Sequence, residues 1–200
     1  MNLQRRAWEI LKKELGSHHP RTIAALNNVA ALNVNQNRLE EAEEDLQRVV
    51  EEGERAWGPE HPAQATALNN LAEVYGRHHR YAQAEPLYLR SAQIMERALG
   101  PQHPLVATVL FNLAESYRLT KRNRLAEPLY LQALEIREKV LGPNHPSVAN
   151  CLSGYVSLLR QEKRKAEASR LETRVKEIRA VQAARNPQSQ AVDWRELKNH

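Results

Sequence analysis

Asparagine side chains recur at matching positions along this sequence, and they are well suited to hold another polypeptide. Each offers one acceptor and two donors, so it can bind a peptide amide unit whatever side chain that unit carries. Asparagines about 42 residues apart could therefore follow an extended ligand. In the alternative interpretation, Asn28, Asn70 and Asn112 bond neighbouring backbone groups within the scaffold. The candidate asparagines are Asn27, Asn28, Asn69, Asn70 and Asn112.

Two arginines lie beside glutamates on the same expected polar face, and each admits two interpretations. Arg77 follows Glu73 by four residues, and Arg118 follows Glu115 by three. A guanidinium is a planar fork of donors, so each arginine could recognise acidic groups on a partner. The alternative is an ion pair with the nearby glutamate, worth only about 0.2–0.5 kcal/mol on a helix surface. The sequence alone allows both.

Thr108 and Phe111 complete the candidate peptide-binding face. Phe111 is the only phenylalanine, and it takes the place in the repeat that Asn27 and Asn69 take earlier in the chain. An exposed ring there would be a natural anchor for a partner. The alternative is that the ring tilts into the interface with the following repeat.

The sequence contains no arrangement of residues typical of an enzyme or a metal site. It lacks a glycine-rich phosphate loop, a Gly-x-Ser-x-Gly turn and an isolated carboxylate pair. The adjacent pairs His18-His19 and His78-His79 do not have the i, i+4 spacing that suits zinc on a helix. Cys151, the single cysteine, is expected to be a small buried apolar residue. We therefore predict no enzymatic activity, no metal and no cofactor.

All these residues belong to a unit that occurs four times. Gly16, Gly58, Gly100 and Gly142 are spaced by 42 residues, and a His-Pro pair follows each glycine at the same distance. A glycine fits the left-handed position after a helix end, and a proline fits the first position of the next helix. The histidine between them is expected at the N-cap. A fixed period of this size predicts a solenoid of stacked units.

Apolar residues at helical spacing predict an all-α chain of one N-terminal helix, about residues 1–15, and four helix pairs. The first helices of the pairs are expected at about 21–35, 63–77, 105–119 and 147–161. The second helices are expected at about 39–57, 81–99, 123–141 and 165–184. We expect one repeat domain over 1–184, with repeats at about 20–57, 62–99, 104–141 and 146–184. Residues 185–200 are expected to form a linker and a short tail helix.

Three segments carry a resemblance to a known family: 68–73 (Leu-Asn-Asn-Leu-Ala-Glu), 84–88 (Ala-Glu-Pro-Leu-Tyr) and 133–149. They resemble tetratricopeptide repeats, in the longer 42-residue form of kinesin light chains and nephrocystin-type proteins. The resemblance implies a right-handed α-solenoid of helix-turn-helix repeats whose first helices line a concave groove. It also implies that an extended peptide binds there, as short cargo motifs with tryptophan and acidic residues bind kinesin light chains.

The resemblance implies that groove asparagines hold the peptide backbone and groove arginines hold its acidic groups. We therefore predict a scaffold for a protein or peptide partner, with an acidic partner as one possibility. Thr108 and Asn112 stand where chaperone-binding members of the family carry a carboxylate clamp, so a chaperone-tail receptor is not expected. The expected peptide-binding residues are Asn27, Asn28, Asn69, Asn70, Glu73, Arg77, Thr108, Phe111, Asn112, Glu115 and Arg118.

Two other classes of function remain as alternatives. One is a self-assembling structural module, in which repeat ends or the tail pair with other copies. The tail segment Val192–Glu196 contains a tryptophan with acidic neighbours, and it could dock in a groove. The other is nucleic-acid binding through residues 160–185, which hold nine Lys or Arg and four Glu. The remaining residues are neutral as a body, so a nucleic-acid partner is not expected.

The sequence also bears on the compartment. It has no apolar stretch long enough for a membrane-spanning helix, and residues 1–6 lack the apolar region of a signal peptide. A single cysteine favours a reducing compartment. We therefore predict no membrane association and a cytoplasmic location.

Overall fold

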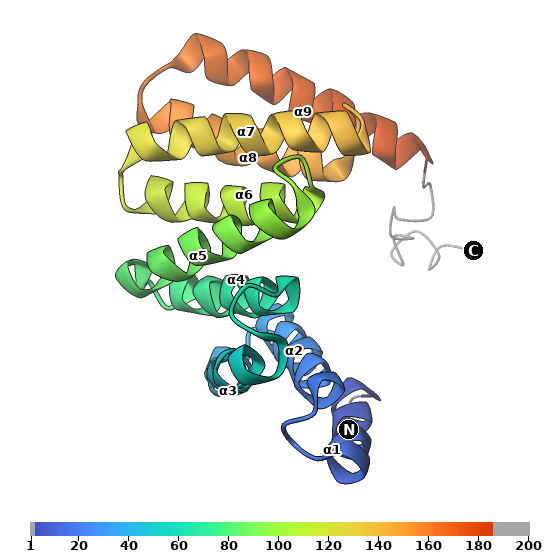
Figure 1. Cartoon of the computed structure of the whole chain (residues 1–200). Coiled ribbons are helices and arrows are strands. Elements are labelled where there is room, and N and C mark those ends of the chain that lie inside the picture. The colour runs from blue at the N-terminus through green and yellow to red at the C-terminus, as the bar shows by residue number, and fades with distance from the viewer. Residues whose placement is uncertain (1–2, 186–200) are drawn as a thin grey trace, which may run out of the picture. The chain divides into compact units, whose positions relative to one another are not determined.

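The computed structural model describes residues 3–185, and within that range the chain forms nine helices and no strand (Figure 1). They are α1 (Leu3–Leu15), α2 (Pro20–Asn35), α3 (Leu39–Trp57), α4 (Pro62–Arg77), α5 (Tyr81–Leu99), α6 (Pro104–Leu119), α7 (Asn123–Leu141), α8 (Pro146–Gln161) and α9 (Lys165–Arg185). The ranges expected for the eight paired helices are confirmed to within one residue. Within residues 3–185, no helix is both long and apolar enough to cross a membrane.

The chain divides within α7 into two compact units, one up to Ala133 and one from Leu134 onward. In the first unit, α2 packs against α3 and α4 packs against α5 as helical hairpins. The first helices of these repeats, α2, α4 and α6, also contact one another in that order. In the second unit, α8 packs against α9 in the same way.

The repeated Gly-x-x-His-Pro segment ends one helix and starts the next. In each copy the histidine is the N-cap, and its Nδ1 accepts a hydrogen bond from the backbone N–H two residues later, at 3.1–3.2 Å. Gly16, Gly58, Gly100 and Gly142 have φ between 85° and 89°, a region that a Cβ makes costly. The N-cap role predicted for the histidines is therefore confirmed.

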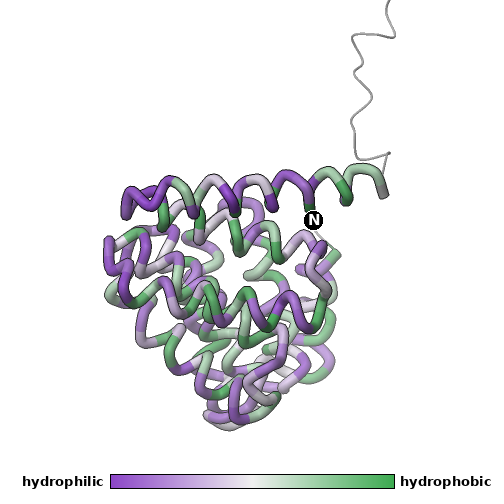
Figure 2. Tube along the Cα trace, turned by 90° about the horizontal axis from the view of Figure 1, so that it is seen from above, coloured by the Kyte–Doolittle hydropathy of each residue, from purple (hydrophilic) through white to green (hydrophobic). Residues whose placement is uncertain are grey.

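Small residues at repeated positions allow the helices to approach closely. Ala30, Ala72 and Ala114 of the first helices are fully buried. Ala42 and Ala84 of the second helices are equally inaccessible. Along the helices, hydrophobic and hydrophilic stretches alternate every few residues (Figure 2), because one face of each helix from α2 to α9 enters the core.

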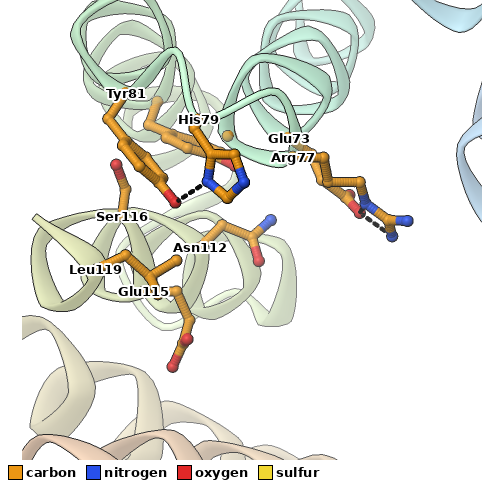
Figure 3. Close-up of a pocket in the computed structure, with 10 residues that line it drawn as sticks. Glu73, Arg77, His79, Tyr81, Asn112, Glu115, Ser116 and Leu119 are labelled. Carbon is orange, nitrogen blue, oxygen red and sulfur yellow. Dashed lines mark hydrogen bonds and ion pairs between the residues drawn. The ribbon is translucent and has the colours of Figure 1, made fainter.

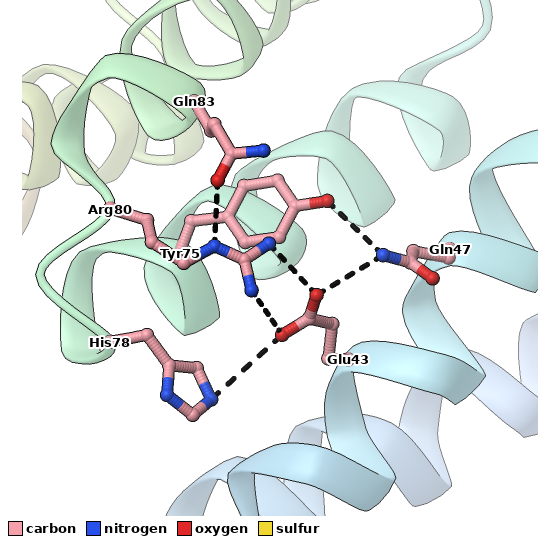
Figure 4. A network of polar contacts seen from close by, with 6 residues as sticks. All are labelled: Glu43, Gln47, Tyr75, His78, Arg80 and Gln83. Carbon is pink, nitrogen blue, oxygen red and sulfur yellow. Dashed lines mark hydrogen bonds and ion pairs between the residues drawn. The ribbon is translucent and has the colours of Figure 1, made fainter.

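A polar clamp joins consecutive repeats of the first unit (Figure 4). The Arg80 guanidinium lies 4.2 Å from the centre of the Tyr75 ring and donates to both carboxylate oxygens of Glu43, at 2.9 and 3.0 Å. Glu43 belongs to the preceding repeat. The same clamp recurs one period later, where Arg122 covers Tyr117 and binds Glu85 through two hydrogen bonds. The two clamps fasten α3 to the α4–α5 turn and α5 to the α6–α7 turn.

Candidate functional site

Four of the predicted asparagines form a hydrogen-bonded chain across α2, α4 and α6. Asn70 donates to Asn27 at 3.1 Å, and Asn112 donates to Asn69 at 3.1 Å. Asn69 donates to Asn70 at 3.4 Å, which links the two pairs. We call this set the asparagine ladder. It uses part of the hydrogen-bonding capacity of each amide.

The ladder differs from the scaffold interpretation drawn from the sequence. The asparagines bond one another between neighbouring first helices, rather than a backbone group of the scaffold. Asn69, which was expected on the polar face, is 9% exposed. Asn28 is exposed on α2 and stands outside the ladder. The shared register was therefore visible in the sequence, but the pairing across a step of 43 residues was not.

Both predicted arginines pair with the glutamate of their own helix. Arg77 binds Glu73 at 2.7 Å and also donates to the backbone carbonyl of Val34, at 3.1 Å. Arg118 binds Glu115 at 2.6 Å, and Glu115 also accepts a hydrogen bond from the Tyr130 hydroxyl. The structure therefore shows the ion-pair interpretation for both arginines.

Thr108 and Phe111 contribute differently from the asparagines. The exposed Thr108 donates from its hydroxyl to the backbone carbonyl of Pro104 at 3.2 Å, within its own helix. The half-buried Phe111 ring meets Tyr130 of α7 edge-on, with ring centres 6.0 Å apart. Phe111 therefore contacts the second helix of its own repeat.

A hollow of about 360 Å³ lies between α4, the α4–α5 turn and α6 (Figure 3), and we call it the α4–α6 hollow. Four predicted site residues line it: Glu73, Arg77, Asn112 and Glu115. Asn112 and Ser116 on α6 face His79 and Tyr81 across it. The structure therefore brings these four predicted residues together, whereas Asn28, Thr108 and Phe111 lie outside the lining.

A second hollow, of about 210 Å³, occupies the equivalent place one repeat earlier, between α2 and α4. We call it the α2–α4 hollow. It is lined by Ala31, Val34, Asn35, Asn70 and Glu73. Moved on by one 42-residue period, these positions become Glu73, Gly76, Arg77, Asn112 and Glu115, which all line the α4–α6 hollow. The first helices α2, α4 and α6 thus present a periodic surface, the first-helix face, which comprises the ladder and the two hollows.

Six residues that line the α4–α6 hollow were missed by the sequence analysis: Gly76, His79, Tyr81, Tyr88, Ser116 and Leu119. The sequence does mark Gly76 as unusual. It is a glycine inside a helix, and the equivalent residues of the other repeats are Val34, Arg118 and Arg160. The sequence does not mark His79, because its φ of 58° is a property of the folded turn. That left-handed conformation sets its ring 3.0 Å from the Tyr81 hydroxyl.

Charges around the α4–α6 hollow act on the phenols nearby. Burial and the Glu73 carboxylate raise the pKa of Tyr88 well above the usual tyrosine range. Burial and the Glu115 carboxylate do the same to the pKa of Tyr130. Both phenols therefore remain protonated hydrogen-bond donors at physiological pH.

The C-terminal alternatives fall largely outside this site. The tail segment Val192–Glu196 and the expected tail helix lie beyond the described residues. In the basic flank, Arg160 pairs with Glu172 and Arg164 pairs with Glu167. Arg174 pairs with Glu138. Three of the nine basic side chains of this flank are therefore paired, one of them with a glutamate from outside the flank.

The fold and the repeated first-helix face define a class of protein. The family model for the tetratricopeptide repeat matches residues 22–91, 64–139 and 116–180. The chain belongs to the tetratricopeptide repeat family. The expected fold class, a right-handed α-solenoid of helix-turn-helix repeats, is confirmed.

Solved structures place the chain among repeats like those of kinesin light chains. A Podosopora anserina protein described as a kinesin light chain with nearly identical TPR-like repeats is 25% identical, with a TM-score of 0.69. The alignment covers 90% of this chain and 85% of that one. A singly substituted variant of that protein is also 25% identical, with a TM-score of 0.70 over 92% of this chain and 86% of that one. BtubC (BKLC) from P. vanneervenii is 22% identical, with a TM-score of 0.77 over 90% and 72% of the two chains, and shows the fold alone.

No curated protein matches the sequence. Tetratricopeptide repeats generally mediate interactions between proteins. Proteins built from them are generally non-enzymatic scaffolds. The ligand of this chain is considered next.

Proposed function

We propose that the chain binds an extended peptide segment of a partner protein along its first-helix face. The observation that carries this proposal is the repetition of a hollow at the same positions of consecutive repeats. Each hollow has an asparagine and a glutamate in the same register, Asn70 with Glu73 and Asn112 with Glu115. An extended peptide presents amide groups and side chains at regular intervals, so a periodic surface of amides and hollows suits it.

The backbone of the peptide would be held by the asparagine ladder. Its amides are already oriented by hydrogen bonds between α2, α4 and α6. Binding therefore costs little side-chain ordering, because these groups are fixed before the ligand arrives. The scaffold acts as a preformed surface and carries out no chemical step.

Acidic groups of a partner are a less direct match to this face. Arg77 is engaged by Glu73 and by the Val34 carbonyl, and Arg118 is engaged by Glu115. An acidic peptide would have to displace a glutamate from one of these arginines. We therefore propose that neutral contacts to backbone and side chains dominate recognition.

The test uses the full 200-residue chain and peptides selected on it from a random displayed library. The double variant Asn70→Ala with Asn112→Ala removes all three hydrogen bonds of the ladder. We expect it to weaken a selected peptide at least about tenfold, or about 1.4 kcal/mol, in fluorescence anisotropy. The unfolding free energy should fall by only about 1–3 kcal/mol, because three neutral hydrogen bonds are lost.

Gln93→Ala is the matched control, since Gln93 is exposed on α5 and lines neither hollow. Its affinity for the peptide should equal that of the wild type. Equal affinity in the double variant, or a failure to select any peptide, would refute the proposal. A large loss of stability would instead assign the asparagines to the scaffold.

Self-association is a second candidate, and one observation favours it. Ile10 of α1 is 55% exposed, although Ile94 and Ile136 at the same repeat position are buried. Leu3 on the same helix is also exposed. We propose that copies of the chain associate and that a second copy covers Leu3 and Ile10 of α1. Light scattering would support this if the measured mass rises with concentration and the Ile10→Glu variant keeps the mass of one chain. A mass that stays constant in the wild type would exclude it.

Two further proposals come from the sequence. One is that residues 1–184 act as a single repeat domain. The other is that the protein works in the cytoplasm.

A further inference from the structure

The Tyr88 side chain is buried, and its hydroxyl has no hydrogen-bond partner among the described residues. Tyr88 is 4% exposed, and its side chain lines the floor of the α4–α6 hollow. Within residues 3–185 its hydroxyl makes no hydrogen bond, because Glu73 is engaged by Arg77 instead. The hydroxyl oxygen is not among the buried side-chain atoms that lack a partner, so it is accessible from the hollow and offers a donor to an incoming group.

Gly76 is what leaves this hydroxyl accessible. A Cβ placed on Gly76 would lie 3.9 Å from the Tyr88 hydroxyl, which is an ordinary contact, so close packing does not require glycine here. Its φ is not in the left-handed region either. A glycine inside a helix nevertheless costs about 1 kcal/mol relative to alanine. Because Gly76 has no side chain, it leaves open space in the α4–α6 hollow next to the Tyr88 hydroxyl.

The rest of the lining restricts what can enter that space. Leu119 and the rings of His79 and Tyr81 supply apolar and aromatic surface, and the buried Ser116 adds a second hydroxyl. Glu73, Glu115 and Arg77 all line the hollow, and Arg77 is paired with Glu73, so an incoming carboxylate would have to displace Glu73 from Arg77. The charges of the two glutamates are already balanced by Arg77 and Arg118, so a cation gains little. The lining therefore suits an uncharged group with a flat apolar body and a polar tip.

We propose that the α4–α6 hollow is a receptor for one tyrosine side chain of the bound peptide, whose phenol oxygen accepts a hydrogen bond from the Tyr88 hydroxyl. This rests on the proposed peptide binding and adds its side-chain preference. The ring lies against Leu119, His79 and Tyr81. Size permits this, since apolar cavities of about 150 Å³ in other proteins take up benzene, and this hollow measures about 360 Å³.

The test uses small probes, so that it does not depend on any peptide. The ¹⁵N-labelled chain is titrated with p-cresol, toluene and p-toluate, which share a ring and differ at the tip. We expect p-cresol to shift amide signals of α4, the α4–α5 turn and α6, with a dissociation constant on the order of 1 mM. Toluene should bind about tenfold more weakly for want of the hydrogen bond, and p-toluate should bind more weakly still.

Variants separate the pocket from the scaffold. Tyr88→Phe removes the donor with little change in volume, and it should abolish the preference for p-cresol over toluene. Gly76→Leu fills the hollow and should abolish binding of both probes. Tyr117→Phe is the matched control, because its hydroxyl donates to Glu85 and does not line the hollow, so p-cresol binding should stay unchanged.

Three results would overturn the proposal: equal binding of toluene and p-cresol, tighter binding of p-toluate, or no saturable shift with p-cresol. None of them bears on the asparagine ladder, so peptide binding along the first-helix face could still hold. Conversely, if p-cresol binds but no peptide can be selected, the α4–α6 hollow is a binding pocket and the proposed peptide-binding function is refuted.

Discussion

The α4–α5 and α6–α7 repeats each have a tyrosine at the same position, but its hydroxyl is bonded differently in the two. In the α6–α7 repeat, Tyr130 is fully buried and donates its hydroxyl to Glu115, which also binds Arg118. In the α4–α5 repeat, Tyr88 occupies the same position, but Glu73 turns to Arg77 and the hydroxyl stays free.

Two neighbouring positions differ, one of which is Arg77 in the place of Leu119. Position 118 holds an arginine, whereas the equivalent position 76 holds a glycine. Arg118 draws Glu115 over Tyr130 and closes that repeat. Gly76 leaves nothing to hold Glu73 there, so Glu73 pairs with Arg77 one turn later and a hollow opens. The comparison shows how a solenoid can acquire a local binding pocket without any change in its backbone repeat.

The two arginines offer the largest expected contrast. The Arg118 side chain is 15% exposed and holds Glu115 beside Tyr130, whereas the Arg77 side chain is 39% exposed. We expect Arg118→Ala to lower the unfolding free energy in urea by about 2–3 kcal/mol, because it strands a partly buried carboxylate. Arg77→Ala should lower it by about 1 kcal/mol or less. Equal losses would show that the two repeats are closed to the same degree.

The two tyrosines offer a smaller contrast with a cleaner chemical change. Tyr130→Phe removes a hydrogen bond to a carboxylate, and we expect it to cost about 1.5–2 kcal/mol of unfolding free energy. Tyr88→Phe removes a hydroxyl that bonds nothing, so its effect should stay within about 0.5 kcal/mol of zero. Urea unfolding of both variants measures this, and a comparable loss in Tyr88→Phe would mean that its hydroxyl already has a partner.

The smallest expected effect has the opposite sign. Gly76→Ala should raise the unfolding free energy by about 0.5–1 kcal/mol, since alanine favours the helix and its Cβ meets nothing closer than 3.9 Å. Gly53→Ala in α3 is the matched control. A Cβ there would lie 2.6 Å from Trp57 Cζ3 and 2.7 Å from Gln64 Oε1, so that variant should be destabilised. A loss of stability in Gly76→Ala would show that packing, rather than an open hollow, requires this glycine.

Much of the fold could be predicted from the sequence, because its determinants are local. The spacing of Gly-x-x-His-Pro indicated the number of repeats, and apolar periodicity indicated the helix ranges to within one residue. The shared alanines correctly indicated close helix contacts, as the buried Ala72 and Ala114 show. Each of these signals depends on residues within one or two helices of each other.

The candidate site was only partly predictable, because its contacts join residues about one period apart. The sequence identified Asn70 and Asn112 as equivalent positions, but not that they donate to Asn27 and Asn69 of the preceding repeat. It left the roles of Arg77 and Arg118 open, and the structure assigns both to ion pairs. A side chain often has two possible hydrogen-bond partners in the sequence. Distances set by the packing decide which of them it binds.

The sequence by itself therefore determined an all-α repeat solenoid and the polar face of its first helices, since period, capping and amphipathicity are properties of the chain taken locally. Only the tertiary structure decided where that face is hollow. Gly76, Tyr88 and Ser116 come from three different helices, and they meet because α4, α5 and α6 pack in order. One repeat later, Arg118 and Tyr130 both bind Glu115, and that arrangement depends on distances that only packing sets.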